Sequence, residues 1–266
     1  MKLIFLLLSF LLPSALADDW PQWFGPEHDG VWRETGIIDK FPDGGPKVLW
    51  RTPVNRGYAG PSVAGDRVFV MDRKALDTQE AKAKGARTGE KQGNERLLCL
   101  NAVTGKVIWE KAYDCPYTMS YSAGPRVTPL VDGDRVYTFG GEGNLICRAT
   151  EDGSKKWAHD FKDLFNVKTQ TWGFAASPLV HGDLLICLAS GDGTTAVAFN
   201  KVSGKEVWRS LTAKQPGYCP PCIVKHKGRD LLLIWHPEAI NALDPLNGKI
   251  YWRVPWKVRY GLTITA

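Results

Sequence analysis

The sequence predicts an all-β protein, a β-propeller built from four-stranded blades, and three observations support this fold class. The 266 residues include 11 Trp, 27 Gly and 17 Pro but only three Met, a composition typical of strands joined by many tight turns. A turn glycine followed by a tryptophan recurs along the chain. Each copy follows another predicted hairpin, so every repeat supplies four strands.

Residues 1–17 contain the three parts of a secretory signal peptide. Lys2 supplies the basic start, residues 3–12 are apolar except for one serine, and Ala15 to Ala17 form an A-x-A cleavage site. The apolar run is too short to remain as a membrane span. We therefore expect cleavage after Ala17, export to the periplasm or the extracellular space, and a mature chain without a transmembrane anchor.

The tryptophan hairpin of each repeat has a glycine four residues before its tryptophan. Residues 98–109 set the pattern, 198–208 and 243–252 repeat it, and 151–157 is a weaker copy. Thr, Asp, Ser or Asn stands directly before each glycine, so a turn with positive φ is expected between two strands. The tryptophans are 48, 51 and 44 residues apart, which is close to the length of a propeller blade: Trp109, Trp157, Trp208 and Trp252.

The hairpin that precedes each tryptophan hairpin begins at a proline and turns at a Gly-Asp pair. Residues 61–70, 129–138 and 178–187 align in this way, and 221–234 is a version with a longer turn. Proline fits a strand start because no ladder donor is lost there. Together the hairpins predict four full repeats, at residues 58–109, 121–157, 172–208 and 218–252.

Both ends of the repeat array suggest that the ring is incomplete. Residues 48–50 (Val-Leu-Trp) resemble the outer strand of another blade whose inner strands are missing, and the sequence stops at Ala266, where the next strand-opening proline is due. We interpret the chain as truncated or fragmentary; a compact variant or an assembly completed in trans are the alternatives. Unpaired sheet edges would favour self-association.

The pattern T-G-K-x-x-W, preceded by S/T-P-x-V-x-G-D, resembles the repeat of β-propellers of the pyrroloquinoline quinone (PQQ) type. The opening WPQWFGP of residues 20–26, with Asp29 and Gly30, is similar to exported bacterial proteins that carry such repeats. The resemblance implies a single propeller domain over residues 18–266 and a tryptophan packed between neighbouring blades. It leaves the activity open, because this propeller serves both dehydrogenases and non-enzymatic scaffolds.

Cys219 and Cys222 form the only C-x-x-C motif of the sequence. In an exported chain the pair is consistent with a redox-active or structural disulfide; the alternative is that both fill small-residue positions of a strand entering a blade. A c-type haem would need His at position 223, where Ile stands, and zinc would need a second ligand pair. The other four cysteines lie mostly in apolar strand patterns typical of buried thiols: Cys99, Cys115, Cys147 and Cys187.

Other classical site patterns are absent from the sequence. No hydrolase, zinc-protease, phosphate-loop or EF-hand motif occurs, and a net charge of +6 without a long basic block argues against nucleic-acid binding. Residues 73–96 are highly charged and are interpreted as a solvated insertion in the first blade, or alternatively as a partner-docking loop. The histidines have no ligand spacing and are expected at the surface or in turns: His28, His159, His181, His226 and His236.

Aromatic residues stand just ahead of each predicted inner strand: Tyr58, Tyr121, Trp172 with Phe174, Tyr218 and Tyr260. Inner strands line the channel of a propeller, so these residues are expected to ring one mouth, with Arg56, Arg126 and Arg259 nearby. The candidate ligand or partner site comprises Tyr58, Tyr121, Arg126, Trp172 and Tyr218, which could stack on a planar acidic quinone or grip an extended peptide. The alternative is inter-blade packing repeated by duplication.

These patterns favour an exported binding scaffold that uses its propeller faces and channel mouth for a protein or peptide partner, without a cofactor. The alternative is a PQQ- and Ca²⁺-dependent dehydrogenase or a fragment of one. No catalytic residue or metal ligand set can be named, since the spacing of the acidic residues in turn-like settings does not converge them: Glu27, Glu142, Asp192 and Glu238.

Overall fold

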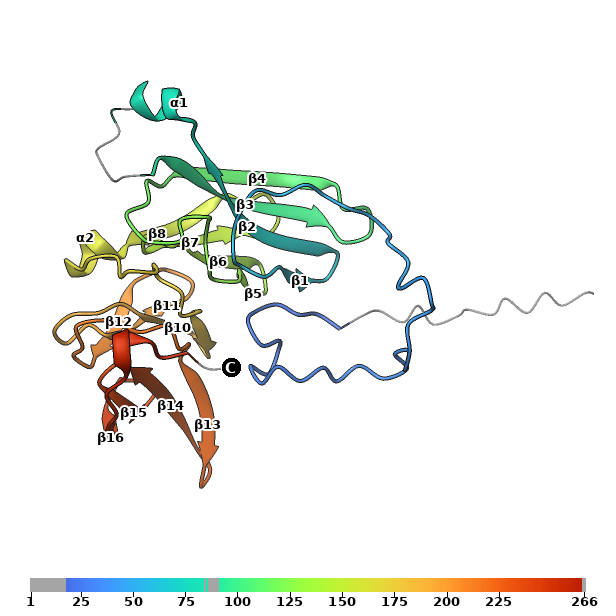
Figure 1. The fold of residues 1–266 in the computed structure, drawn as a ribbon. Coiled ribbons are helices and arrows are strands. Elements are labelled where there is room, and N and C mark those ends of the chain that lie inside the picture. Colours follow the sequence, from blue (N-terminus) through green and yellow to red (C-terminus); the bar gives the residue numbers. More distant parts are fainter. Residues whose placement is uncertain (1–17, 84, 86–90, 265–266) are drawn as a thin grey trace, which may run out of the picture.

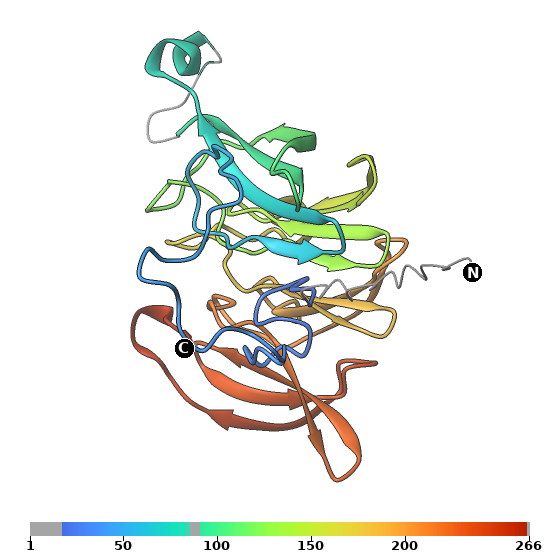
Figure 2. The same ribbon diagram turned by 90° about the vertical axis from the view of Figure 1, so that its right-hand side faces the viewer.

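The computed structural model describes residues 18–83, 85 and 91–264. The predicted signal peptide (1–17), residues 84 and 86–90 of the charged segment, and residues 265–266 lie outside the described part. The strands of that part form four antiparallel sheets of four strands each (Figure 1). The predicted propeller architecture is confirmed as an arc of four blades, which the described residues do not close into a ring (Figure 2).

The strands of each sheet follow one another in chain order. The first sheet contains β1 (Ser62–Ala64), β2 (Arg67–Ala75), β3 (Gly93–Asn101) and β4 (Val107–Asp114). The second contains β5 (Leu130–Asp132), β6 (Arg135–Phe139), β7 (Asn144–Ala149) and β8 (Lys155–Asp160). The third contains β9 (Leu179–His181), β10 (Leu184–Leu188), β11 (Ala196–Asn200) and β12 (Glu206–Ser210). The fourth contains β13 (Cys222–His226), β14 (Arg229–His236), β15 (Ala239–Leu243) and β16 (Ile250–Pro255).

In the described part of the chain, three short helices lie outside the sheets. The structure has α1 (Thr78–Ala83) between β2 and β3, α2 (Phe161–Phe165) after β8, and the 3-10 helix η1 (Arg259–Gly261) after β16. Within the described residues, no helix is long and apolar enough to cross a bilayer.

The turn before each outer strand needs a glycine. Gly105, Gly153, Gly204 and Gly248 have φ values of 68°, 71°, 71° and 71°, in the left-handed region that other residues enter only at a cost. These are the four glycines of the repeat pattern, so its turn chemistry is explained by backbone conformation.

The indole rings of the first three repeat tryptophans contact the following sheet. Trp109 Nε1 donates to the carbonyl of Thr150 at 3.0 Å, Trp157 Nε1 to Lys201 at 3.1 Å, and Trp208 Nε1 to Pro245 at 3.0 Å. Each ring also lies over the turn glycine of that sheet. A methyl group at Gly153, Gly204 or Gly248 would lie 2.8, 2.6 or 2.6 Å from the ring of Trp109, Trp157 or Trp208, respectively.

The hydrophobic core consists of layers between neighbouring sheets. One cluster combines Phe139 of the second sheet with Phe199 of the third, and another combines Ile186 of the third with Ile234 of the fourth. A similar layer joins the first and second sheets. Burial of these apolar faces stabilises the arc sheet against sheet.

Residues 48–50 correct one expectation, because they form no strand. They have no ladder partner in the described part of the chain. Trp50 nevertheless donates from Nε1 to the carbonyl of Ala102 at 2.9 Å and lies against Gly105 of the first sheet. Trp50 therefore lies over the turn glycine of the following sheet, as the tryptophans of the repeats do, although residues 48–50 form no strand.

The charged segment 73–96 corrects a second expectation, because it is not a solvated insertion over its whole length. Residues 73–75 belong to β2 and residues 93–96 belong to β3. β2 and β3 pair as far as Ala75 and Gly93, so only the residues between them leave the ladder. Arg73 is 3% exposed and Glu95 is fully buried, and Arg96 pairs with Asp72 at 2.6 Å. The charges of Asp72 and Arg96 therefore compensate each other across the two strands, and a linear sequence does not show this.

Candidate functional site

One end of the arc, which we call the loop face, collects the long connections. Consecutive strands run antiparallel, so the turn between the second and third strands of a sheet leaves from the same end as the link to the next sheet. This end carries α1, α2 and the links 115–129 and 161–178, which lie together on one side of the sheets (Figure 1). The loop face is where the aromatic residues ahead of the inner strands are held.

A cavity with a volume of ≈ 300 Å³ on this side, the arginine–aromatic pocket, brings together three of the five candidate residues. The rings of Trp172 and Tyr218 lie 5.8 Å apart between centroids, with a tilt of 59°. The N-terminal segment reaches the pocket because Pro21 accepts a hydrogen bond from Val131 N at the inner strand β5 (2.8 Å). The pocket is lined by Trp23, Arg126, Trp172, Ala175, Ser177, Tyr218, Pro220, Leu262 and Ile264.

Arg126 is the only charged residue among the described residues that line this pocket. Its Nη2 donates to the carbonyls of Ser120 at 3.0 Å and Tyr121 at 2.6 Å, and its Nη1 donates to that of Gly124. Burial lowers the pKa of Arg126 because the charged form loses solvation. No carboxylate of the described residues forms an ion pair with it, so its positive charge is available to an anionic group.

The remaining candidate residues lie beside the pocket. The guanidinium of Arg126 stands 5.1 Å from the ring centroid of Tyr58, and Tyr58 and Tyr121 are 55% and 70% exposed. Tyr121 has a φ of 51°, a conformation that costs free energy for a residue with a side chain. Arg126 thus holds the link 120–126 through three backbone carbonyls, and the side chains of Tyr58 and Tyr121 beside it face solvent.

Two other aromatic residues ahead of inner strands are not part of the pocket. Phe174 is buried in the core layer between the second and third sheets, so the inter-blade packing alternative applies to it. Tyr260 is exposed, and Arg259 lies 4.9 Å from the centroid of its ring.

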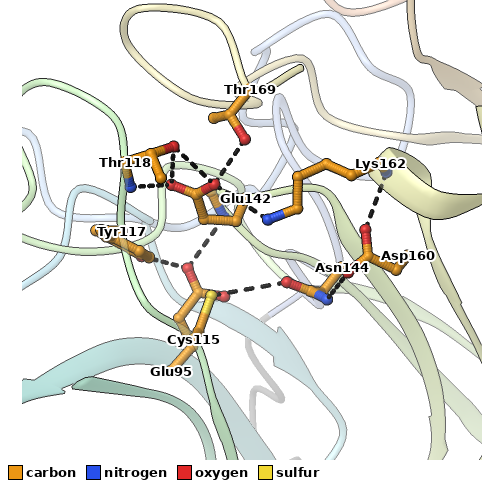
Figure 3. Close-up of polar contacts among 10 residues, drawn as sticks. Glu95, Cys115, Tyr117, Thr118, Glu142, Asn144, Asp160, Lys162 and Thr169 are labelled. Carbon is orange, nitrogen blue, oxygen red and sulfur yellow. Dashed lines mark hydrogen bonds and ion pairs between the residues drawn. The ribbon is translucent and has the colours of Figure 1, made fainter. Parts of the chain in front are cut away.

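A buried polar cluster beneath the loop face was missed by the sequence reasoning (Figure 3). Glu142, in the turn between β6 and β7, is almost fully buried. It accepts hydrogen bonds from Thr118 N at 2.6 Å and Thr169 Oγ1 at 2.6 Å, and Lys162 Nζ of α2 lies 3.3 Å away. One carboxylate therefore ties two links and a helix to the second sheet.

Glu95 forms the other half of this cluster (Figure 3). It accepts hydrogen bonds from the hydroxyls of Tyr113 and Tyr117 and from Gly141 N at 2.9 Å. Burial raises the pKa of Glu95 and, with the nearby carboxyl, that of both tyrosines. Neither Glu95 nor Glu142 lines the arginine–aromatic pocket, so the cluster fixes the shape of the loop face without reaching a ligand there.

The other acidic residues considered from the sequence stay apart from this cluster. Asp192 accepts a hydrogen bond from Thr212 at 2.8 Å, and Glu238 accepts one from Lys214 N at 3.2 Å. Among the described residues, no group of three or more His, Cys, Asp or Glu is placed to hold a metal ion.

The histidines and cysteines are distributed through the sheets. His236 is buried at the end of β14, and burial lowers its pKa; the expectation of a surface or turn position is wrong for this residue. Cys99, Cys115, Cys147 and Cys187 are buried thiols, and burial raises the pKa of Cys147 to about 11. Cys219 is buried with its Sγ 3.4 Å from the carbonyl of Pro220, and Cys222 is half-buried.

Comparisons with known proteins agree with the observed architecture. A family model described as outer membrane protein assembly factor BamB matches residues 36–160 and 93–257. BamB of Alkalilimnicola ehrlichii is 25% identical over 201 residues, which are 74% of this chain and 43% of that protein.

Comparison with solved structures gives matches at low sequence identity, of which the first supports the fold. The quinohemoprotein alcohol dehydrogenase of Comamonas testosteroni superposes with a TM-score of 0.52 and 16% identity over 90% of this chain and 49% of its own. BamB of Moraxella catarrhalis gives a TM-score of 0.48 and 15% identity over 77% of this chain and 51% of its own. The chain thus spans about half the length, or less, of these relatives. Because the family model covers most of the chain, and the four blades have the expected form, this protein belongs to the PQQ-like β-propeller repeat family that includes the BamB assembly factors.

Proposed function

We propose that this chain is an exported binding scaffold whose loop face holds a protein partner, with the arginine–aromatic pocket as the anchoring point. The observation that carries the proposal is Arg126, a partly buried cation without a carboxylate partner among the described residues, next to the rings of Trp172 and Tyr218. The relative of this chain in A. ehrlichii is named an outer membrane protein assembly factor. By analogy, and with the signal peptide predicted for residues 1–17, we place its action in the periplasm, on a protein of that assembly process.

The chemistry of the pocket indicates the part of the partner that enters it. The described lining is mainly apolar and aromatic with a single cation, Arg126. A volume of ≈ 300 Å³ lies at the small end of ligand pockets. Such a pocket fits one or two side chains: an aromatic or apolar group against Trp172 and Tyr218, and a carboxylate at Arg126. A charge-assisted hydrogen bond of this kind is worth about 1.5–3 kcal/mol.

The pocket fits poorly with the alternative, a quinone-dependent enzyme. A planar quinone needs approximately parallel stacking faces, metal ligands and a base in one pocket. Trp172 and Tyr218 are tilted by 59° at a centroid distance of 5.8 Å, which leaves no slot for a flat ring between them. We therefore propose no reaction step.

A peptide titration tests the proposal. Purified chain 18–266 is titrated with a capped peptide containing adjacent Phe and Asp, and with the matched Phe-Asn peptide, and binding is followed by tryptophan fluorescence and calorimetry. We expect the Asp peptide to bind at least tenfold more tightly, and Trp172→Ala to weaken the binding of both peptides. The control Lys249→Ala, at the opposite end of the fourth sheet, should bind as the parent does.

Two results would contradict the pocket proposal. Equal affinity for the two peptides would remove the role of Arg126, and unchanged binding by Trp172→Ala would place the site elsewhere. Saturable micromolar binding of PQQ with Ca²⁺, together with alcohol-dependent dye reduction, would favour the dehydrogenase.

We also propose that the outer strand of the fourth sheet promotes self-association. All six residues of β16 are exposed, including Tyr251, Trp252 and Val254. Exposed apolar strands recruit other surfaces. Sedimentation velocity of chain 18–266 should reveal concentration-dependent oligomers, whereas a monodisperse monomer up to high concentration would contradict this proposal.

A further inference from the structure

We propose that a basic groove on the loop face of the first sheet binds an extended acidic peptide segment. The groove has a volume of ≈ 1150 Å³, and the described residues that line it include five cations: Arg56, Arg73, Lys74, Lys82 and Lys91. It shares no lining residue with the arginine–aromatic pocket. The proposal therefore stands whether or not that pocket binds a peptide.

The charge of the groove selects an anionic occupant. Asp77 is the only acidic residue among the described residues that line it. The Asp77 carboxylate already accepts hydrogen bonds from Gln79 N and Glu80 N, both at 2.8 Å, at the start of α1. Five cations against one acid, whose carboxylate is already hydrogen-bonded, create a local positive potential that attracts carboxylates.

Arg73 adds a buried donor to this charge. It is 3% exposed, its guanidinium lies 4.1 Å from the ring centroid of Tyr117, and its Nη2 donates to the carbonyl of Lys91. Its Nε has no hydrogen-bond partner among the described residues. The nearby Glu95 forms no ion pair with it within the described part, since the Glu95 carboxylate accepts from two tyrosines and Gly141 N. A buried donor without an acceptor costs free energy, which a ligand carboxylate in the groove would recover.

The backbone at the groove favours an extended peptide over other anions. Arg73 N donates to the carbonyl of Arg56 at 2.8 Å, so this edge of β2 already accepts a strand-like neighbour. Leu76 N donates in the opposite direction, to Gln92 of the neighbouring strand at 3.1 Å. Ala75 lies between Arg73 and Leu76 in the sequence and pairs in register with Gly93. The backbone groups of successive residues in an antiparallel strand point to opposite sides. The N–H and C=O of Ala75 therefore point to the same side as those of Arg73, toward the groove. An added strand can therefore form ladder hydrogen bonds at Ala75 while its acidic side chains meet the cations.

Two exposed tyrosines border the same groove. Tyr58 and Tyr121 line it and offer ring faces and hydroxyl groups to a peptide at little entropic cost. Neither residue has to move out of a core to do so.

The test compares matched peptides on matched variants. A fluorescein-labelled (Glu-Ser)4 peptide and its (Gln-Ser)4 counterpart are titrated into chain 18–266 by fluorescence anisotropy, at low and at physiological salt. We expect (Glu-Ser)4 to bind at least tenfold more tightly than (Gln-Ser)4, and the double variant Lys74→Gln/Lys82→Gln to lose at least tenfold. The control Lys205→Gln/Lys249→Gln, which removes the same charge from the opposite end of the sheets, should lose less than twofold. Thermal melts establish that both variants are folded, and Trp172→Ala should bind (Glu-Ser)4 as the parent does.

Several results would overturn the proposal. Equal losses in the two double variants would mean that only net charge matters, and equal binding of both peptides would remove the anionic specificity. A (Glu-Ser)4 peptide N-methylated at alternate residues should bind more weakly, and unchanged affinity would contradict strand addition at Ala75. Binding to phosphatidylglycerol vesicles that depends on Lys74 and Lys82, without peptide binding, would assign the groove to a lipid surface instead.

Discussion

The junction between the third and fourth sheets and the outer face of the fourth sheet present the same residue in two environments. Trp208 is 7% exposed and donates to the carbonyl of Pro245 at 3.0 Å. Trp252 stands at the same position of the next repeat, is 42% exposed, and has no acceptor within the described part of the chain. The hairpin that carries the tryptophan is equivalent in both. The comparison teaches that the following sheet, not the hairpin itself, determines how much the tryptophan contributes to the stability of the fold.

The largest expected difference between the two regions is in the free energy of unfolding. Trp208→Ala should cost about 3–5 kcal/mol, as for other buried aromatic residues, because it empties a core layer and leaves the Pro245 carbonyl without its donor. Trp252→Ala should cost less than about 1 kcal/mol. Urea denaturation followed by circular dichroism measures both values.

Similar costs for the two tryptophan variants would contradict the comparison. A small cost for Trp208→Ala would mean that the junction contributes little, and a large one for Trp252→Ala would mean that an oligomer covers it. Repeating the measurement at two protein concentrations distinguishes the second case, since only an oligomer shows a concentration-dependent midpoint.

The turn glycine beneath each indole gives a second, smaller effect. Gly204 and Gly182 both have positive φ, of 71° and 56°, but a methyl group would lie 2.6 Å from the Trp157 ring at Gly204 and would meet nothing within 4 Å at Gly182. Gly182→Ala should therefore cost only about 1–2 kcal/mol of backbone strain. Gly204→Ala should cost about 1–3 kcal/mol more, because it also overpacks the junction. Equal costs in the same denaturation experiment would show that the indole does not press on the glycine.

The smallest expected effect concerns the pH dependence of stability and the buried cluster. Burial raises the pKa of Glu95 above its usual 4.5 in the folded protein, so the folded state binds its proton more tightly than the unfolded state. Its contribution to stability is then full below about pH 4.5 and is lost as the pH rises through the folded-state pKa. Glu95→Gln should therefore become more stable relative to the parent as the pH increases above 4.5.

Melting temperatures from pH 4 to 8 measure this trend. The control is Glu151→Gln, at an exposed carboxylate without an ion pair among the described residues, and it should run parallel to the parent over the whole range. A constant difference between Glu95→Gln and the parent would mean that Glu95 titrates as it does in water.

The sequence predicts the architecture well because the repeat depends on local chemistry. Gly204 and Trp208 are four residues apart, and their turn forms within the hairpin itself. The long first sheet could not be predicted in the same way. Asp72 and Arg96 are far apart in the sequence and neutralise each other across β2 and β3 at 2.6 Å, so a linear reading sees only two exposed charges.

The same distinction applies to the candidate site. Trp172, Tyr218 and Arg126 were predicted together because each stands just ahead of an inner strand, a position defined by sequence. The Glu95 cluster depends on ladder register, which places Glu95 opposite Tyr113, and on the turn at Gly141 in another sheet. Sequence alone gives neither the register nor the neighbour, although the apolar run at residues 97–100 is a signal that the end of this charged segment belongs to a strand.

The repeated junction of an indole ring over a turn glycine has a consequence for how the number of blades evolves. Each blade offers a tryptophan on one side and, on the other, a turn glycine and a carbonyl that receive the tryptophan of the preceding unit. Insertion or loss of one whole repeat by gene duplication or deletion therefore leaves a compatible junction between the new neighbours. Blade number is for this reason a property that evolution can alter without redesigning any single interface, and the order of the blades should be open to permutation in an engineered chain.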